Sequence, residues 1–369
     1  NYYIDAPRIT LNEFSHIPVY VMIYKDAVYA SNIDKTQFLM KLQCVKLYDV
    51  NNGDELIASS PHCFAGSTDI NFHDPLWVNF MIDKAGLEKN TENQYILKAK
   101  IELENHVDIW EGPITIKELN EIPELDNYYC GDTHYHGEYT LNPSEFGGLI
   151  TATKDSGKSM GLDWTFITDH SFDLDEDKWN QEKLRIQEIT DDEFVIIQGE
   201  EVSCENDALL EPINTYSHYL AYNTQQLIEG GEKERAFHPA FDSGGGNYDC
   251  SDLPGIVNGL NSGNGFGYVA HPTHGDVEGL APGDPFRTIW TEYDTKYTGL
   301  EIWNGWNEGD KSELEDGLAE YEKVLTKTRK GEKVFISAGS DAHGQFQDFG
   351  RVKTCCQMNE LTEENILDA

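Results

Sequence analysis

The sequence predicts an α/β protein in which an all-β region precedes a region of alternating strands and helices. Three observations predict this. Residues 1–118 carry strand patterns without helical ones, the chain from Tyr128 onward alternates between the two, and metal-ligand side chains follow several strands of that second region. At 369 residues the chain is also too long for one average domain. We therefore expect an accessory domain at 1–118, a linker at 119–127 and a larger domain at 128–369.

The N-terminal region is predicted to fold from strands alone. Its segments rich in β-branched and aromatic residues are Ile17–Tyr24, Phe38–Tyr48, Trp77–Asp83 and Gln94–Glu104. The last of these alternates apolar and polar residues, as a half-buried strand does. Several strands without helices predict a β-sandwich. We expect no metal ligand among the scattered histidines of this region, which are His16, His62, His73 and His106.

The charge of the chain argues against some classes of partner. Its 66 acidic and 27 basic residues give a net charge of −39, which disfavours binding to duplex nucleic acid or to an anionic membrane surface. No apolar run approaches the roughly 18 residues that span a bilayer. We therefore expect a soluble protein that acts on a small molecule, and its oligomeric state stays open. The start at Asn1 fits a processed or trimmed chain, so export is one expectation and the compartment stays open.

The cysteines predict neither a zinc ribbon nor a dense disulfide framework. There are seven of them, an odd number, and no C-x-x-C pair occurs. Cys130 immediately precedes a histidine motif and could be a metal ligand, although a small buried apolar residue is the commoner role of an unpaired cysteine.

From Tyr128 the pattern of alternation predicts parallel β/α architecture. Leu149–Met160 and Trp179–Ile189 have helical patterns, and Asp163–Thr168 and Phe194–Gln198 have strand patterns. In parallel β/α folds the functional residues gather where the strands end.

The most informative motif is Gly131-Asp132-Thr133-His134-Tyr135-His136-Gly137. If it forms a strand, His134 and His136 share one face, and Asp132 points the same way. Two imidazoles on a rigid backbone supply half of a metal site, and the alternative is a hydrogen-bonded pair at a strand end. Further ligand-type residues follow or lie in later strands, namely Asp169, His170, Glu200, Glu201, His218, His271, Asp341 and His343. Such a series predicts a metal site on one rim of the fold.

Residues 130–367 resemble the polymerase and histidinol phosphatase (PHP) family of metal-dependent hydrolases. The motifs that carry the resemblance are Asp132–His136, Gly161–Asp163 with Thr168–His170, Gly199–Glu201, Ala270–Pro272 and Gly339–His343. Ser217–Tyr219 and Leu300–Gly305 further resemble the branch that includes carbaryl hydrolase. The resemblance implies a distorted (β/α)7 barrel with two or three divalent transition-metal ions, and mixed His and carboxylate ligands suit Zn, Mn or Fe.

The resemblance also implies which residues hold each metal. The first position matches His134, His136, Glu201 and Asp341. The second matches Glu201, His218 and His271, so that Glu201 would bridge the two. The third matches His170 and His343, and either Glu138 or Asp169 replaces a histidine that some family members carry, or the third metal is weak or absent. Glu201 is chosen over Glu200 because the family pattern is Gly-x-Glu, and Glu200 is then expected to point away.

The chemistry implied by these ligands is hydrolysis by a hydroxide that bridges two metals. Asp341, His343 or His274 would protonate the leaving group, and Arg351 would anchor a phosphate. We expect a phosphoesterase that acts on a small phosphate ester. Two alternatives stay open: a carboxylic or carbamate ester hydrolase, and a catalytically silent module that binds metal or a surface.

Overall fold

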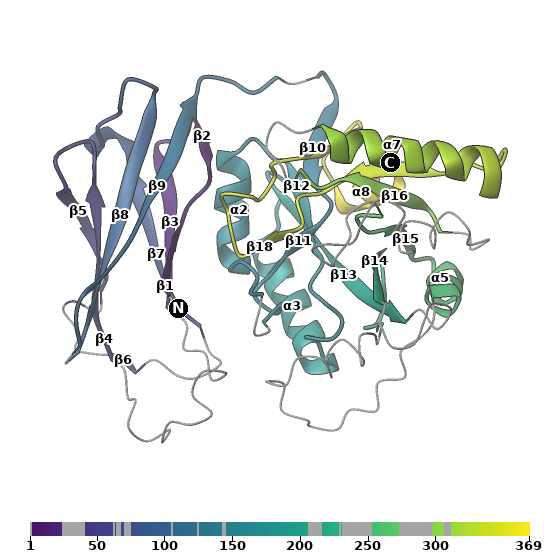
Figure 1. The fold of residues 1–369 in the computed structure, drawn as a ribbon, viewed down its shortest axis with the longest axis horizontal. Helices are drawn as coiled ribbons and strands as arrows, with labels where there is room; N and C mark the ends of the chain where they lie inside the picture. Colours follow the sequence, from purple (N-terminus) through teal and green to yellow (C-terminus); the bar gives the residue numbers. More distant parts are fainter. Residues whose placement is uncertain are drawn as a thin grey trace. The chain divides into compact units, whose positions relative to one another are not determined.

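The computed structural model describes residues 2–23, 41–61, 63, 68–69, 75–104, 106–123, 125–141, 145–205, 216–228, 230, 253–272, 297–305 and 311–369. The chain divides into two compact units, and Figure 1 labels most of their helices and strands. One unit comprises Asn1–Leu125, Asp155–Gly161 and Gln345–Asp348, and the other comprises Asp126–Lys154, Leu162–Gly344 and Phe349–Ala369. The described residues form a mixed α/β structure, which confirms the predicted class.

The first unit contains two sheets. The three-stranded sheet is antiparallel, with the order β1 (Tyr2–Asp5), β3 (His16–Ile23) and β7 (Leu76–Asp83). The other sheet has the order β2 (Ile9–Leu11), β9 (Ile109–Leu119), β8 (Gln94–Leu103), β4 (Lys41–Asp49) and β5 (Glu55–Ser59), with β6 (Thr68–Asp69) against β4. A short helical turn, η3 (Lys84–Gly86), follows β7.

Alternating sequence explains why these strands share one apolar core. In β8 every second residue is buried, and Leu97 and Ile101 join Val19 and Val21 of β3 in a single cluster. The strand β9 was not predicted, and it ends at Leu119, the first residue of the expected linker. Its sequence gave a weak signal because most of its side chains are exposed or only partly buried.

The second unit is built on an eight-stranded sheet. Its strand order is β17 (Phe335–Ala338), β16 (Gly299–Trp303), β15 (Phe266–Val269), β14 (Tyr216–Tyr222), β13 (Val195–Glu205), β12 (Trp164–Ile167), β10 (Tyr128–Asp132) and β19 (Thr354–Gln357). The parallel pairing that the β/α alternation predicts fails at two strands. The strand β14 is antiparallel to both of its neighbours, and β19 is antiparallel to β10.

A hydroxyl group joins the two ends of this sheet. Thr354 Oγ1 of β19 accepts a hydrogen bond from Ala338 N of β17 at 2.8 Å and donates one to Ala338 O at 3.0 Å. The sheet therefore curves until its outer strands meet, as in a nearly closed barrel. Among the described residues after β10, the helices are α2 (Ile150–Ser159), α3 (Glu176–Ile189), α5 (Leu253–Ser262), α7 (Ser312–Lys323) with the π-helical turn η4 (Val324–Thr328), and α8 (Glu363–Asp368). No described helix is long and apolar enough to cross a bilayer.

A disulfide bond corrects both expectations for Cys130. Cys130 lies opposite Cys355 in the antiparallel pair of β10 and β19, and their sulfurs are bonded. A second disulfide joins Cys44 and Cys63 in the first unit. The partner of Cys130 is 225 residues away in the sequence, so local reasoning could not find it. Cys130 is therefore neither a metal ligand nor an unpaired apolar residue.

The chain that carries the His-x-His motif is broken into two short strands. β10 ends at Asp132, and β11 (Tyr135–His136) instead pairs in parallel with β18 (Ala342–His343). The prediction that Asp132 points the same way as the two histidines is wrong. Its carboxylate accepts hydrogen bonds from the backbone N–H groups of His134, Ser340 and Gly350 at 2.8–3.1 Å. It thereby holds together the three chain segments that surround the site.

Candidate metal centre

Among the described residues of the second unit, three overlapping groups of His, Glu and Asp side chains have ligand atoms close enough together to hold metal ions. Their members are His134, His136, Glu201 and Asp341 in the first group, His170, Glu201 and His218 in the second, and His136, His170 and His343 in the third. All of these side chains are buried except that of His343, which is partly exposed.

The first group has the spacing of a tetrahedral site. Asp341 Oδ1 lies 3.1 Å from both His134 Nε2 and His136 Nε2, and these two nitrogens are 3.2 Å apart. Glu201 Oε2 lies 3.2 Å from His136 Nε2 and 3.4 Å from His134 Nε2. Tetrahedral coordination with bonds of about 2.0–2.1 Å separates ligand atoms by about 3.3 Å. The four side chains therefore already surround a volume that fits one divalent ion.

The two carboxylate oxygens of Glu201 face different sets of imidazoles. Oε2 faces His134 and His136, whereas Oε1 lies 2.9 Å from His218 Nδ1 and 3.1 Å from His271 Nε2. His218 reaches this rim because β14 runs antiparallel to β13, which places its early residues beside the end of β13. One carboxylate thus stands between two sets of nitrogen ligands, which is the arrangement that a bridging ligand requires.

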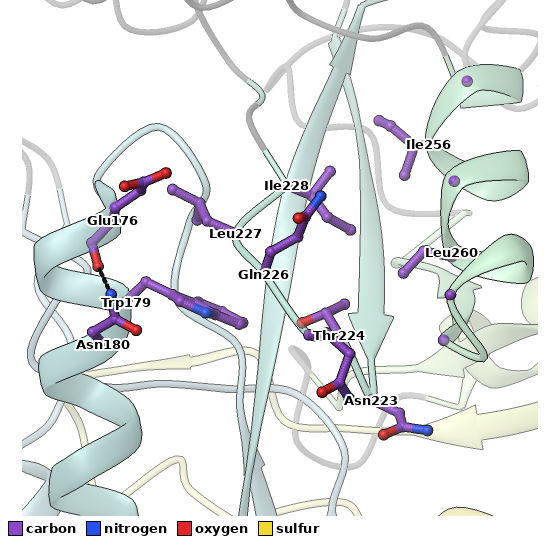
Figure 2. Close-up of a pocket in the computed structure, with 15 residues that line it drawn as sticks. Glu176, Trp179, Asn180, Asn223, Thr224, Gln226, Leu227, Ile228, Ile256 and Leu260 are labelled. Atoms are coloured by element: carbon purple, nitrogen blue, oxygen red, sulfur yellow. Dashed lines mark hydrogen bonds between the residues drawn. The ribbon is translucent and has the colours of Figure 1, made fainter.

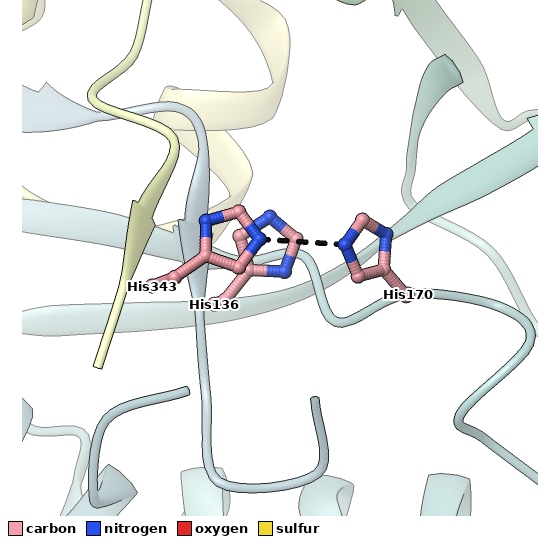
Figure 3. A group of neighbouring side chains, drawn as sticks. All are labelled: His136, His170 and His343. Carbon is pink, nitrogen blue, oxygen red and sulfur yellow. Dashed lines mark hydrogen bonds between the residues drawn. The ribbon is translucent and has the colours of Figure 1, made fainter. Parts of the chain in front are cut away.

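The third group is assembled by the pairing of β11 with β18 (Figure 3). The rings of His136 and His343 stack with centroids 3.9 Å apart, and His343 Nε2 lies 3.4 Å from His170 Nε2. On its other side, His170 Nδ1 lies 3.0 Å from Glu201 Oε2. His170 therefore connects the third group to the carboxylate of the first two.

Two buried atoms support the fit of this donor set to a cation. Glu201 Oε2 and His170 Nδ1 are only 3.0 Å apart, yet neither has a hydrogen-bond partner within the described part of the chain. Buried polar atoms are nearly always satisfied, so exceptions require an explanation. A cation bound by both atoms would satisfy them together.

Opposite charges shift the pKa values of the central residues. Burial lowers the pKa of His134, but the charges of Asp341, Glu301 and Glu201 outweigh it and raise that pKa well above 6.5. Burial also lowers the pKa of His170, but Glu201 and Glu145 outweigh it and raise that pKa well above 6.5. Burial raises the pKa values of Glu201 and Asp341, but the neighbouring histidines outweigh it and hold both well below the usual range. Burial and the charge of His136 lower the pKa of His343 to about 3.

Two of the ligand-type residues have an unusual backbone. His271 has a φ angle of +27° and Asp341 a φ angle of +50°, in the region that non-glycine residues seldom adopt. Such a conformation costs on the order of 1–3 kcal/mol and persists only where surrounding contacts enforce it. Both strained residues belong to the ligand-type set, so the contacts around the candidate site must enforce these conformations.

Three predicted site residues, Asp169, Glu138 and Arg351, lie outside the three metal-ligand groups and contact other residues. Asp169 belongs to none of the three groups, and its carboxylate lies near the buried Glu182. Burial and the charge of Asp169 raise the pKa of Glu182 well above 4.5. Glu138 pairs with Arg185 and accepts a hydrogen bond from Ile150 N at 3.3 Å. Arg351 donates to the carbonyl oxygens of Asn304 and Ser340, both at 2.9 Å.

Several other residues complete the comparison with the sequence. The candidate proton donor His274 lies outside the described residues, as do His62 and His73. His16 and His106 are described, and neither belongs to a metal-ligand group. Glu200 is buried beside Glu201, but its Oε2 accepts a hydrogen bond from Ile228 N at 3.0 Å, away from the three groups.

Sequence reasoning missed two acidic residues at the centre. Glu145 Oε2 lies 3.3 Å from His170 Nε2, and its side chain is 40% exposed. Nothing in its surrounding sequence signals this position. Glu301 Oε2 lies 3.0 Å from His134 Nδ1, and although Glu301 belongs to the Leu300–Gly305 motif, no role at the centre was predicted for it.

A separate cavity of about 980 Å³ lies away from these groups (Figure 2). It is lined by α3, α5 and the segment 223–228, with Trp179 and Leu260 among its side chains. None of the ligand-type residues lines it, and Glu176 is the only ionisable residue among the lining residues. Because the reactive side chains converge elsewhere, we place the candidate site at the three groups.

Comparison with known proteins gives little further guidance. No family model matches the chain, and no curated protein matches it. The solved structures that match include a protein from Bifidobacterium adolescentis, provisionally described as a metal-dependent phosphoesterase. It is 13% identical, its TM-score is 0.38, and the match covers 64% of this chain and 94% of that chain. A likeness at this level does not establish a shared function.

Proposed function

We propose that the second unit is a metal-dependent hydrolase of ester bonds whose centre holds two or three divalent ions, such as Zn, Mn or Fe. The observation that carries this proposal is the position of Glu201, because its two oxygens face separate sets of imidazoles at 2.9–3.4 Å. When bound, the ions would supply Lewis acidity and allow water to ionise near neutral pH.

The chain's own residues have distinct tasks in this proposal. Glu201 and Asp341 supply negative charge that offsets the ions, and the imidazoles fix the ions relative to the substrate. His343 is the most exposed of the six histidines in the centre, at 19% of its side chain, but its pKa is lowered to about 3, so it would be neutral near pH 7 and suits the role of a neutral ligand better than that of a proton donor. Asp341 stays ionised because nearby histidines lower its pKa, which favours a ligand role over that of an acid.

The first choice of substrate is a small phosphate ester, because the ions would neutralise its charge. A carboxylic or carbamate ester is the second candidate, and one observation favours it. The guanidinium of Arg351 already donates to two carbonyl oxygens, which leaves it fewer donors for a phosphate.

We also propose that residues 1–118 form an accessory β-sandwich, which is supported by the single core shared by their two sheets.

A paired substrate panel tests the function. Metal-loaded protein would be assayed with p-nitrophenyl phosphate, bis-p-nitrophenyl phosphate, p-nitrophenyl acetate and an aryl N-methylcarbamate, with Glu201→Gln as the matched control. Chelator-sensitive hydrolysis of a phosphate ester that Glu201→Gln abolishes is the expected result. Hydrolysis of only the acetate or carbamate would favour the second candidate. Full metal content without hydrolysis of any substrate would indicate a silent binding module.

A further inference from the structure

Glu301 contacts ligand-type residues from both sides of Glu201. Its side chain is fully buried, and its Oε2 and Oε1 lie 3.0 Å and 3.2 Å from His134 Nδ1. Oε2 also accepts a hydrogen bond from the backbone N–H of His271 at 3.1 Å. Asn304 Nδ2 donates to the same oxygen at 3.3 Å. One carboxylate thus touches the ring of one ligand-type residue and the backbone of another.

The contact with His134 fixes which ring nitrogen faces the centre. A carboxylate beside Nδ1 requires a hydrogen on Nδ1, so the lone pair of the neutral ring lies on Nε2. Nε2 is the atom that lies 3.1 Å from Asp341 and 3.4 Å from Glu201. Carboxylates that accept from the outer nitrogen of a ligating histidine orient the ring and increase its basicity.

The contact with His271 acts through the backbone. The φ angle of +27° at His271 is strained, and the hydrogen bond from its N–H to Glu301 is one contact that holds this conformation. The same conformation brings His271 Nε2 to 3.1 Å from Glu201 Oε1. Loss of the acceptor would let the backbone relax and withdraw the ring from the second set of ligands.

A glycine makes room for this arrangement. A Cβ atom on Gly339 would lie 2.7 Å from Glu301 Oε1 and 2.5 Å from His134 Cβ, which is closer than such atoms approach. Any side chain at residue 339 would therefore force Glu301 and His134 apart. The absence of a side chain here is a second, independent feature of the chain that allows the carboxylate to reach the histidine.

We propose that Glu301 is a positioning residue that couples the two metal positions on either side of Glu201. It orients His134 for the first position and holds His271 for the second, and so its loss weakens both. The inference rests on the proposed metal centre, but it concerns metal affinity and needs no substrate.

Stepwise titration of the metal-free protein with Co²⁺, followed by its visible absorption and by chelator competition, tests the coupling. Glu301→Gln keeps the shape of the side chain but offers one acceptor oxygen for three donors, which are His134 Nδ1, His271 N and Asn304 Nδ2. Glu301→Asp keeps the charge but shortens the side chain by one methylene. Glu320→Gln is the control, because Glu320 is equally buried but pairs with Lys323 on α7. Circular dichroism would verify that each metal-free variant is folded.

Both Glu301 variants should lower the affinity for Co²⁺ at the first and at the second metal position by about 10- to 100-fold. Glu320→Gln should change neither affinity. Wild-type affinity at either position in Glu301→Gln would overturn the coupling. Wild-type affinity in Glu301→Asp would show that charge alone matters and would overturn the positioning role. If the Glu301 variants bind the ions more weakly than the wild type, but the wild type hydrolyses no ester, the proposed hydrolase function fails and the coupling stands.

Discussion

His136 lies directly opposite His343 in the parallel pair of β11 and β18, and their rings stack with centroids 3.9 Å apart. Each strand of this pair has only two residues, so few hydrogen bonds hold it. The third group therefore depends on long-range contacts such as those of Asp132 with Ser340 and Gly350. We expect this group to be the weakest of the three metal positions.

Removal of single histidines should separate the metal positions. His218 and His271 both face Glu201 Oε1, whereas His134 and His136 face Oε2. We therefore expect His218→Ala and His271→Ala each to lose about one metal equivalent per chain and to retain the ion at the first position. Elemental analysis after gel filtration measures this. Simultaneous loss of every ion in both variants would contradict separate positions.

Glu145 should support the third position, although no sequence signal marks it. Its carboxylate lies 3.3 Å from His170 Nε2, so Glu145→Gln removes a negative charge beside that group. We expect a lower affinity for the last ion bound in a Co²⁺ titration, with the first two unchanged. Glu138→Gln is the matched control, because Glu138 pairs with Arg185 instead. Equal effects of the two substitutions would count against a local role for Glu145.

The stability of the metal-free protein should depend on pH in a defined direction. Nearby carboxylates raise the pKa values of His134 and His170 above 6.5, so their contribution is complete below 6.5 and is lost as the pH rises through the raised values. Glu201, with a pKa lowered below 4.5, contributes above 4.5 and loses this contribution as the pH falls through its lowered value. These three groups together therefore contribute most between about pH 4.5 and 6.5, and thermal unfolding of the wild type beside variants of the three residues measures that contribution.

Metal binding should have the opposite dependence on pH. An ion must displace the protons held by His134 and His170, so metal affinity should rise as the pH rises from 6 to 8, with protons released on binding. Calorimetric titration in buffers of different ionisation enthalpy counts these protons. Metal uptake without proton release at pH 7 would show that the two histidines are neutral in the metal-free protein.

The sequence predicted much of the framework because its signals are local. Ligand-type side chains follow buried strands such as Trp164–Ile167, and helix α3 was expected at Trp179–Ile189. The helix starts three residues earlier, because Asp175 caps it and accepts a hydrogen bond from Lys178 N at 2.8 Å.

The remaining features depend on contacts between distant segments. The direction of β14 is set by its pairing with β13 and β15, and the role of Cys130 by a partner on β19. Asp132 looked like a third member of the His-x-His face, yet its carboxylate binds backbone N–H groups because the strand ends there. Periodicity within one segment cannot reveal a strand end or partner that distant residues determine.

The central claim is that Glu201 bridges two metal ions, and its neighbour supplies the most direct test. Glu201→Gln and Glu200→Gln make the same change at adjacent buried residues, but only Glu201 faces the histidines, whereas Glu200 accepts from Ile228 N. Metal content and hydrolytic turnover would be measured for both variants beside the wild type. We predict that Glu201→Gln loses at least one metal equivalent and all measurable turnover, while Glu200→Gln retains both. A metal-poor, inactive Glu200→Gln beside a functional Glu201→Gln would contradict the bridge.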